Sequence, residues 1–447
     1  MKQDLTTGSV FKRIVYFSLP YLLSYFLQTL YGMADLFITG QFYGVDTITA
    51  VSNGSQIMHM MTVIIVGLAM GTTVTIGHSV GAKCMEQAEK IIGNTITLFM
   101  GIAVAFTVIL VVLVKPIVVL IAAPQEAVAG TSIYLLICFI GIPFITAYNI
   151  ISSIFRGLGD SKSPMYFIGI ACVMNIALDY LFMGAFHMGA AGAALGTVCA
   201  QTFSVLVALW VIRRRKTGIS LKKSDFKIER AVIGQVLKIG IPVALQDGFI
   251  QVAFMIITVI ANSRGVSDAA AVGIVEKVIS ALFIVPSSML ATVSALSAQN
   301  LGAGKEKRAT DTLHYATVIT TIYGMIVAVL IQFIAENVVG IFTSDTTVVT
   351  MGSAYIRSYI WDCIFAGIHF SFSGYFAACG KSYIGFLHNI ISITFVRVPG
   401  SYLASKYFTD TLYPMGLAAP AGSLVSVAIC VTAFILLKRK SRVAQTA

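Results

Sequence analysis

The stretch "CVMNIALDYLF", residues 172–182, combines an apolar run with two strongly polar side chains, Asn175 and Asp179. It lies inside a longer apolar segment, 164–186, which is long enough to cross about 30 Å of hydrocarbon as a helix. Such a segment must be helical, because lipid offers the backbone no hydrogen-bond partners. The stretch therefore predicts a membrane helix that carries an amide and a carboxylate.

The whole chain repeats this apolar character. Of its 447 residues, 57% are hydrophobic and only 11% are charged, and the mean hydropathy is +0.88, which is far outside the range of soluble globular proteins. We predict an all-α integral membrane protein with twelve transmembrane helices. The expected spans are 14–39, 47–79, 91–121, 127–155, 164–186, 188–212, 231–262, 268–300, 309–335, 346–378, 383–405 and 413–437.

The net charge of +11 follows the loops between these spans. Lys115, Arg264 and Lys406 are the basic residues of one set of alternate loops, whereas the other set contains most of the lysines and arginines, including the "RRRKTGISLKKSDFKIER" segment at 213–230. By the positive-inside rule, both termini and this segment are cytoplasmic, in a multi-pass protein of the cell membrane. Topology explains the basic charge, so no nucleic-acid partner is expected.

The sequence resembles itself at an offset of about 221 residues. "GHSVGAK" at 77 aligns with "AQNLGAGK" at 298, and "FRGLGDSKSP" at 155 aligns with "FAACGKSYIG" at 376. We predict an N-lobe at 1–212, a basic linker at 213–230 and a C-lobe at 231–447. The two six-helix bundles are expected to be related by a pseudo-two-fold axis along the membrane normal.

Two similar bundles that face each other would form a cleft and could expose it to each side of the membrane in turn, as transporters do. A duplication kept for a scaffold or a channel is the alternative. The "VGAK" and "LGAGK" stretches lack the spacing of a phosphate-binding loop and indicate helix ends with tight turns.

Four polar residues of the N-lobe are expected at similar depths in the membrane. Asn175 and Asp179 are spaced i, i+4 and share a helix face. Asp35, Asp179 and Thr197 lie about 33, 25 and 24 Å along their helices from the nearest predicted cytoplasmic anchors.

A carboxylate in a membrane span costs at least about 2.5 kcal/mol, so it should face the bundle interior and have a function there. Two carboxylates, an amide oxygen and a hydroxyl suit a small cation. The carboxylate pair could equally bind a proton. Asp35, Asn175, Asp179 and Thr197 are thus a candidate site for a cation or a proton, with helix packing as the alternative, most of all for Thr197.

The C-lobe does not repeat this set, because Asp35, Asn175 and Asp179 align with Ile256, Val396 and Gly400. It has other charged residues within its spans: Asp247, Glu276, Lys277, Arg357, Asp362 and Arg397. Glu276, Asp362 and Arg397 are candidates for a second polar site. Whether these residues line a cleft or pair with one another is left open by the sequence.

Several motifs together resemble the multidrug and toxic compound extrusion (MATE) family, in the superfamily that includes lipid-linked oligosaccharide flippases. They are "SLP" at 18, "MADLFITGQFYG" at 33, "VTIGHSVGAK" at 74, "FRGLGDSKSP" at 155, "MNIALDY" at 174 and "SALSAQNLGAGK" at 294. The resemblance covers nearly the whole chain. It implies export of cationic amphipathic compounds by antiport with Na⁺ or H⁺.

The same resemblance implies that Asp35, Asn175, Asp179 and Thr197 form the cation site, with Tyr134 close to it. A flippase for a lipid-linked precursor is the alternative, although it would be expected to have a cleft rich in Arg and Lys. An enzyme is not expected, because no nucleophile and base set or metal motif is present. We expect no cofactor, no metal beyond a Na⁺ at the coupling site, small organic substrates, contact with membrane lipid, and a monomer.

Overall fold

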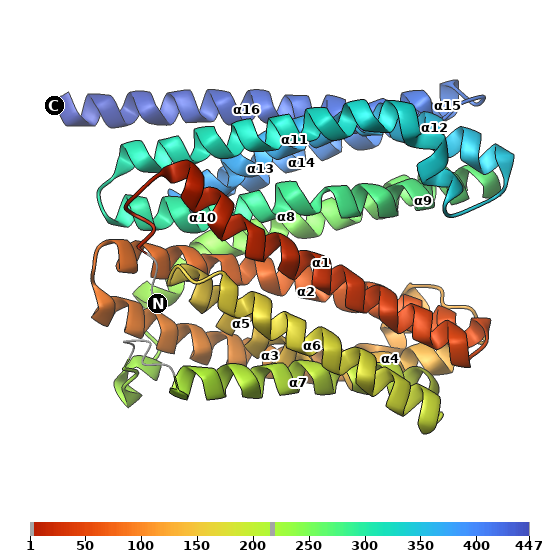
Figure 1. Cartoon of the computed structure of the whole chain (residues 1–447), viewed down its shortest axis with the longest axis horizontal. Coiled ribbons are helices and arrows are strands. Elements are labelled where there is room, and N and C mark those ends of the chain that lie inside the picture. Colours follow the sequence, from red (N-terminus) through yellow and green to blue (C-terminus); the bar gives the residue numbers. More distant parts are fainter. Residues whose placement is uncertain (1–3, 215–219, 447) are drawn as a thin grey trace. The chain divides into compact units, whose positions relative to one another are not determined.

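The computed structural model describes residues 4–214 and 220–446, which form helices joined by short turns and contain no β-strand (Figure 1). The helices are long and lie roughly along a common direction within each half of the chain. This arrangement follows from the sequence, since long apolar runs in lipid must satisfy their backbone hydrogen bonds internally.

In the first half of the chain, six expected spans are helical and two of them are interrupted. The fourth span is bent by 51° where α4 meets α5, and the fifth ends in a π-helical segment. The elements are α1 (Val10–Phe42), α2 (Val45–Gly81), α3 (Met85–Leu120), α4 (Val128–Ile140), α5 (Ile142–Gly157), α6 (Lys162–Asp179), the π-helical Tyr180–Ala185 and α7 (Gly189–Arg214).

The second half of the chain follows the same order. The elements are α8 (Arg230–Asn262), α9 (Val266–Leu282), α10 (Ile284–Gly302), α11 (Glu306–Gly340), α12 (Thr346–Tyr359), α13 (Asp362–Ala378), α14 (Ser382–Ser392), the π-helical Ile393–Arg397, α15 (Val398–Tyr407) and α16 (Tyr413–Thr446). A short 3₁₀ helix, Lys223–Phe226, lies between the two halves in the sequence. All twelve expected spans are therefore helical.

Length and composition alone identify fewer of these spans. In the part of the chain that the structure describes, eight helical segments are long and apolar enough to cross a membrane, and the bent α4–α5 pair makes nine. The other three expected spans are α1, α12 with α13, and α14 with α15. Tyrosine, serine and glutamine residues lower the mean hydropathy of α1, and polar residues are what a helix lining a protein interior carries.

Two turns show that the repeat extends to the backbone. Lys83 (φ 60°) follows α2, and Gly304 (φ 70°) follows α10 at the equivalent position of the repeat. Gly159 (φ 88°) and Gly380 (φ 69°) form a second such pair after α5 and α13. A left-handed residue lets the chain reverse immediately after a helix. The tight turns predicted at "VGAK" and "LGAGK" are confirmed.

The chain separates into two compact units. Unit 1 is mainly Val15–Ala244, and unit 2 is mainly Leu245–Leu301 together with the chain from Lys305 onward. The chain passes from unit 1 to unit 2 inside α8, so the first half of this helix packs with unit 1. The predicted lobes, 1–212 and 231–447, are defined by the repeat in the sequence and not by these units. Their boundaries stay a prediction.

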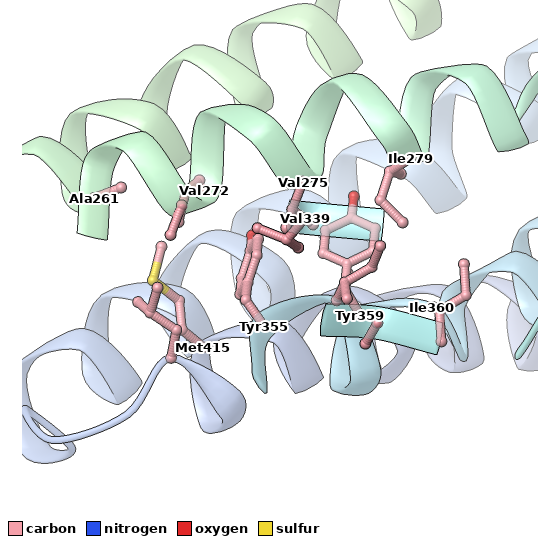
Figure 2. Packing of buried hydrophobic residues seen from close by; sticks show 14 of the residues in the cluster. Ala261, Val272, Val275, Ile279, Val339, Tyr355, Tyr359, Ile360 and Met415 are labelled. Atoms are coloured by element: carbon pink, nitrogen blue, oxygen red, sulfur yellow. The ribbon is translucent and has the colours of Figure 1, made fainter. Parts of the chain in front are cut away.

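The core of unit 2 is built around α12. Figure 2 shows Tyr355 and Tyr359 of α12 beside Val275 and Ile279 of α9, and the two tyrosine rings lie 5.7 Å apart between centroids. All four side chains are at most 1% exposed. Burying such large side chains in unit 2 fixes α12 against α9, and it also places the two phenol groups inside the bundle.

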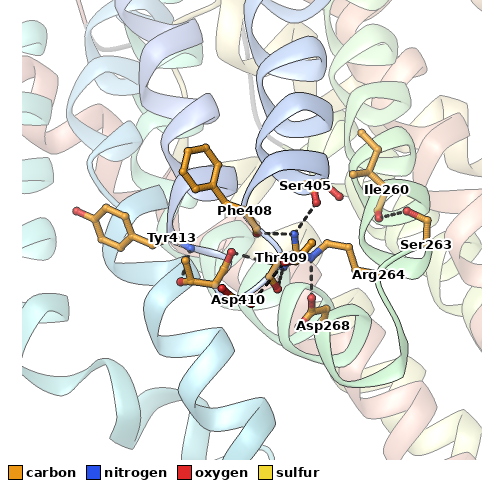
Figure 3. A network of polar contacts seen from close by, with 10 residues as sticks. Ile260, Ser263, Arg264, Asp268, Ser405, Phe408, Thr409, Asp410 and Tyr413 are labelled. Carbon is orange, nitrogen blue, oxygen red and sulfur yellow. Dashed lines mark hydrogen bonds and ion pairs between the residues drawn. The ribbon is translucent and has the colours of Figure 1, made fainter.

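Arg264, in the turn between α8 and α9, organises one end of unit 2 (Figure 3). It donates to the Oδ2 atom of Asp268 at 2.6 Å and to the carbonyl oxygens of Ser405, Phe408 and Thr409, each at 2.9 Å. These carbonyls lie at the C-terminal end of α15, where a helix leaves its acceptors unpaired. One side chain therefore joins the α8–α9 turn to the turn before α16.

Candidate functional site

Three helices of unit 1 bring the predicted polar residues together. Asp35 lies on α1, Asn175 and Asp179 lie on α6, and Thr197 lies on α7. The hydroxyl group of Thr197 donates to Oδ2 of Asp35 at 3.3 Å. Asn175 and Asp179 are close enough to interact with the Asp35 carboxyl group, although neither makes a hydrogen bond of ordinary geometry with it. The structure therefore groups all four residues.

The position of Asp35 is set by contacts one turn further along α1. Thr39 donates to the backbone carbonyl of Asp35 at 2.6 Å, and its Oγ1 atom lies 3.5 Å from the Sδ atom of Met183. Tyr43 donates to the carbonyl of Met183 at 3.1 Å and accepts from the backbone N–H of Gly189 at 2.8 Å. The end of α1 is thus fastened to the π-helical segment and to the start of α7.

The π-helical segment begins directly after Asp179. A π-turn widens a helix locally and leaves backbone groups in irregular geometry, and such turns are frequent at functional sites. Here it follows the last residue of the candidate site and carries Met183, which is completely buried. The sequence predicts the helix but gives no sign of this interruption.

The site contains buried oxygens that no group in the described part of the chain satisfies. Asp35, Asn175 and Asp179 are exposed by 2%, 2% and 0%, respectively. Among the described residues, no hydrogen-bond partner is found for Oδ1 of Asp35, both carboxyl oxygens of Asp179 and both polar side-chain atoms of Asn175. Leaving a buried polar atom unpaired costs about 1–3 kcal/mol, so a ligand that pairs with these oxygens would be held strongly. A proton or a small cation has the required charge.

Two glycines complete the site, although nothing in the sequence distinguishes them from the other glycines of their helices. A methyl group at Gly196 of α7 would collide with Oδ1 of Asp179, so the missing side chain makes room for the carboxylate. A methyl group at Gly54 of α2 would collide with the ring of Tyr134, which is 2% exposed on α4. The "GAAGAALG" stretch at 189–196 signals close helix approach, but not which of its glycines faces the acid.

Arg397 lies at the centre of a second polar cluster, in unit 2. It ends the π-helical segment Ile393–Arg397 and donates to the hydroxyl group of Tyr359. Its guanidinium carbon lies 5.4 Å from the ring centroid of Tyr359 and 5.1 Å from that of Phe254 on α8. Two aromatic faces and a phenol oxygen thus lie around this half-buried cation.

The other two candidates of the C-lobe lie within electrostatic range of Arg397. Glu276 of α9 accepts from Thr258 at 3.3 Å, and its second oxygen is unpaired. Asp362 begins α13 and is 1% exposed, and within residues 4–214 and 220–446 neither of its carboxyl oxygens has a hydrogen-bond partner. Both carboxylates interact electrostatically with Arg397. Glu276, Asp362 and Arg397 therefore form one charge network.

The other three charged residues predicted within the C-lobe spans have different surroundings. Arg357 pairs with Glu336 of α11 at 3.2 Å, with side-chain exposures of 33% and 64%. Lys277 is exposed, as expected for a residue next to the half-buried Glu276 on a helix. Asp247 on α8 is half-buried. The structure thus distinguishes these three residues from the Arg397 network, which the sequence alone could not do.

Unit 2 also contains a buried pair of histidines, His369 and His388. The rings of His369 on α13 and His388 on α14 lie 5.3 Å apart between centroids, and Nε2 of His388 lies 2.9 Å from Oγ of Ser373. Their exposures are 4% and 0%. The two histidines belong to different helices on either side of a turn, so no local motif could have revealed the pair.

In the part of the chain that the structure describes, no group of three or more His, Cys, Asp or Glu residues could hold a metal ion. The unit 1 site has two carboxylates and completes its oxygen set with an amide and a hydroxyl.

Comparison with known proteins gives consistent matches along the whole chain. The sequence model of the MatE family matches residues 20–181 and again 242–403, so the family model itself occurs twice in the chain. The chain is 29% identical over 415 residues to the probable multidrug resistance protein YpnP of Bacillus subtilis, which covers 93% of each chain. It is 24% identical to the multidrug export protein MepA of Staphylococcus aureus, over 83% of this chain and 82% of that protein.

Solved structures share the fold. The outward-facing conformation of a multidrug resistance MATE family transporter matches with a TM-score of 0.91 at 20% identity, over 100% of this chain and 99% of the other. A transporter of the same superfamily from Pyrococcus furiosus matches with a TM-score of 0.90 at 20% identity, over 98% and 97%. The twelve-helix membrane fold is therefore that of the solved MATE transporters, and the two family matches repeat, to within a residue, the offset found within the sequence. This chain belongs to the MatE family and is a MATE family transporter.

Proposed function

We propose that this transporter exports small organic cations from the cell by antiport with Na⁺ or H⁺. The observation that carries the proposal is the buried site of unit 1, where Asp35 and Asp179 offer unpaired carboxyl oxygens beside Asn175. Relatives over most of the chain are named multidrug resistance or multidrug export proteins, which supports the choice of cargo. The protein would lie in the cell membrane as a monomer, with both termini in the cytoplasm.

Binding of the coupling ion would act through the packing of α1, α6 and α7. A cation or a proton between Asp35 and Asp179 removes the repulsion of two buried carboxylates and so favours the arrangement in which they lie together. If substrate favours a different arrangement, the two ligands reduce each other's affinity by the same factor. Reciprocal exclusion of this kind is what couples export of one to entry of the other.

The charge network of unit 2 has a different composition. Arg397 places a fixed positive charge beside Glu276 and Asp362, so this network already contains a cation of its own. We propose that coupling occurs in unit 1. Glu276 and Asp362 would act in substrate binding or in holding α9 and α13.

The test is the accumulation of ethidium in a bacterial host that lacks its own efflux pumps. Cells with the unchanged transporter should accumulate less dye than cells without the transporter. Cells with Asp179→Asn should accumulate as much dye as cells without the transporter, because the amide removes the ionisable oxygen. Asp46→Asn is the matched control, since Asp46 is an exposed carboxylate at the start of α2. Export by Asp179→Asn at the unchanged rate would contradict the proposal. If the unchanged protein exports no organic cation, the flippase alternative becomes the next one to test.

A further inference from the structure

The segment that joins the two halves of the chain is strongly basic. Residues 213–230 contain eight Lys or Arg and two Asp or Glu residues, which gives a net formal charge of +6. The described part of it, 220–230, includes the 3₁₀ helix Lys223–Phe226 and leads into α8. We call residues 220–230 the linker segment.

The linker segment is fixed to α3 through its backbone. The side-chain amide of Asn94 donates to the carbonyl of Asp225 at 3.1 Å, and its oxygen accepts from the backbone N–H of Glu229 at 2.7 Å. Thr97, one turn further on, donates to the carbonyl of Phe226 at 2.9 Å. Because these contacts use backbone groups of the segment, they hold it in place without occupying its side chains.

Close packing also fixes the segment. A methyl group at Gly93 of α3 would collide with the carbonyl oxygen of Asp225, so the two backbones touch there. Ser220 donates from its backbone N–H to Glu89 of α3 at 2.7 Å. A flexible tether would not need a glycine at its docking site, so this stretch is an ordered part of unit 1.

The side chains of the linker segment point outward almost without exception. Among residues 221–230, Asp225 is buried and the other nine are exposed. The apolar side chains of Leu221, Phe226 and Ile228 are exposed by 40%, 38% and 62%. The exposed lysines Lys222, Lys223 and Lys227 lie between them in the sequence. An ordered row of exposed ammonium groups beside exposed apolar side chains is typical of a segment that lies in the membrane interface.

The preceding helix places this segment near the lipid head groups. Trp210 is 59% exposed in the last turns of α7, and the guanidinium carbon of Arg214 lies 5.5 Å from its ring centroid. Exposed tryptophans of membrane proteins gather at the head-group level, where one end of the ring is apolar and the other is wet. The linker segment starts shortly after Arg214 in the sequence, and it docks beside the first turns of α3.

We propose that the linker segment is a binding site for anionic phospholipid. Lys222, Lys223 and Lys227 would bind the head-group phosphate, while Phe226 and Ile228 would enter the boundary with the acyl chains. Juxtamembrane clusters of basic residues attract anionic lipids of the cytoplasmic leaflet. The site is independent of the proposed transport function, because it uses neither Asp35 nor Asp179.

The experiment places a reporter in the segment itself. Phe226→Trp in a chain that also carries Trp210→Phe and Trp361→Phe has a single tryptophan, in the linker segment. Its fluorescence is measured in mixed micelles with increasing brominated phosphatidylglycerol or brominated phosphatidylcholine. We expect half-maximal quenching at a fraction of phosphatidylglycerol at least about fivefold lower than that of phosphatidylcholine, since each of the three lysines near an anionic surface contributes about this factor. The preference should weaken at high NaCl concentration because salt screens exposed charges.

Two lysine variants of the reporter chain separate a site from general charge attraction. Lys222→Gln, Lys223→Gln and Lys227→Gln together should abolish the preference. The matched control removes three charges from exposed lysines elsewhere, by Lys83→Gln, Lys307→Gln and Lys438→Gln, and it should keep the preference. Equal quenching by the two lipids in the reporter chain would overturn the proposal, and so would loss of the preference in the control. Abolition of the preference by millimolar inorganic phosphate would overturn the lipid assignment and indicate a site for free phosphate.

Discussion

At the scale of single residues, the candidate site contains polar side chains that can be predicted from the sequence and a glycine that cannot. Asn175 and Asp179 are recognisable because polar residues spaced i, i+4 stand out in an apolar run. Asp35 and Thr197 could be grouped with them by their estimated depth and by the family resemblance. Gly196 could not be predicted, because in a helix rich in Gly and Ala nothing distinguishes the glycine that contacts a carboxylate.

Gly196→Ala should impair coupled transport more than it impairs folding. The added methyl group overlaps Oδ1 of Asp179, and moving the carboxylate aside costs about 1–3 kcal/mol, as overpacking usually does. We expect a loss of dye export comparable to that of Asp179→Asn, with a small fall in the melting temperature of the purified protein.

The matched control for that substitution is Gly101→Ala on α3, where a methyl group would have no neighbour within 4 Å. It should leave export unchanged and raise the melting temperature slightly, because alanine favours a helix by roughly 0.5–1 kcal/mol over glycine. Full export by Gly196→Ala would show that the position of Asp179 has little influence on transport.

At the scale of helices, the long spans are predictable and their interruptions are not. The twelve expected spans all occur as helices. Most of them can be predicted from the length of the apolar run alone. The 51° bend between α4 and α5 and the two π-helical segments depend on neighbouring helices. At the bend, for example, Gly141 leaves room for Val198 of α7, a contact between residues far apart in the sequence.

Arg264→Ala should destabilise unit 2 at the end where Arg264 joins two turns. The substitution leaves the carbonyls at the end of α15 and the carboxylate of Asp268 without their donor, and removing one partner of a buried ion pair costs about 3 kcal/mol. We expect a clearly lower melting temperature and faster proteolysis near residues 405–411. Lys115→Ala is the control, because Lys115 is an exposed basic residue in the last two turns of α3. Equal melting temperatures for the two variants would refute the assigned role.

At the scale of the whole chain, two similar halves carry unlike polar sites. The repeat was visible in the sequence and recurs in the backbone, where Lys83 and Gly304 adopt the same left-handed turn at equivalent positions. The acidic site of unit 1 and the Arg397 network of unit 2 differ in charge, as the sequence predicted when Asp35 and Asp179 aligned with apolar or small residues. The internal pairing of the C-lobe charges could not be predicted, because it depends on how α9, α13 and the π-helical segment Ile393–Arg397 meet.

The most direct test of the central claim, that the carboxylates of unit 1 couple transport to a cation, uses the purified protein in liposomes. A fluorescent organic cation is followed under an imposed Na⁺ gradient and then under an imposed pH gradient, with unchanged protein and with Asp179→Asn. We predict that one of the two gradients drives the dye and that Asp179→Asn abolishes this movement while the variant inserts normally. Equal gradient-driven transport by the unchanged protein and by Asp179→Asn would contradict the account.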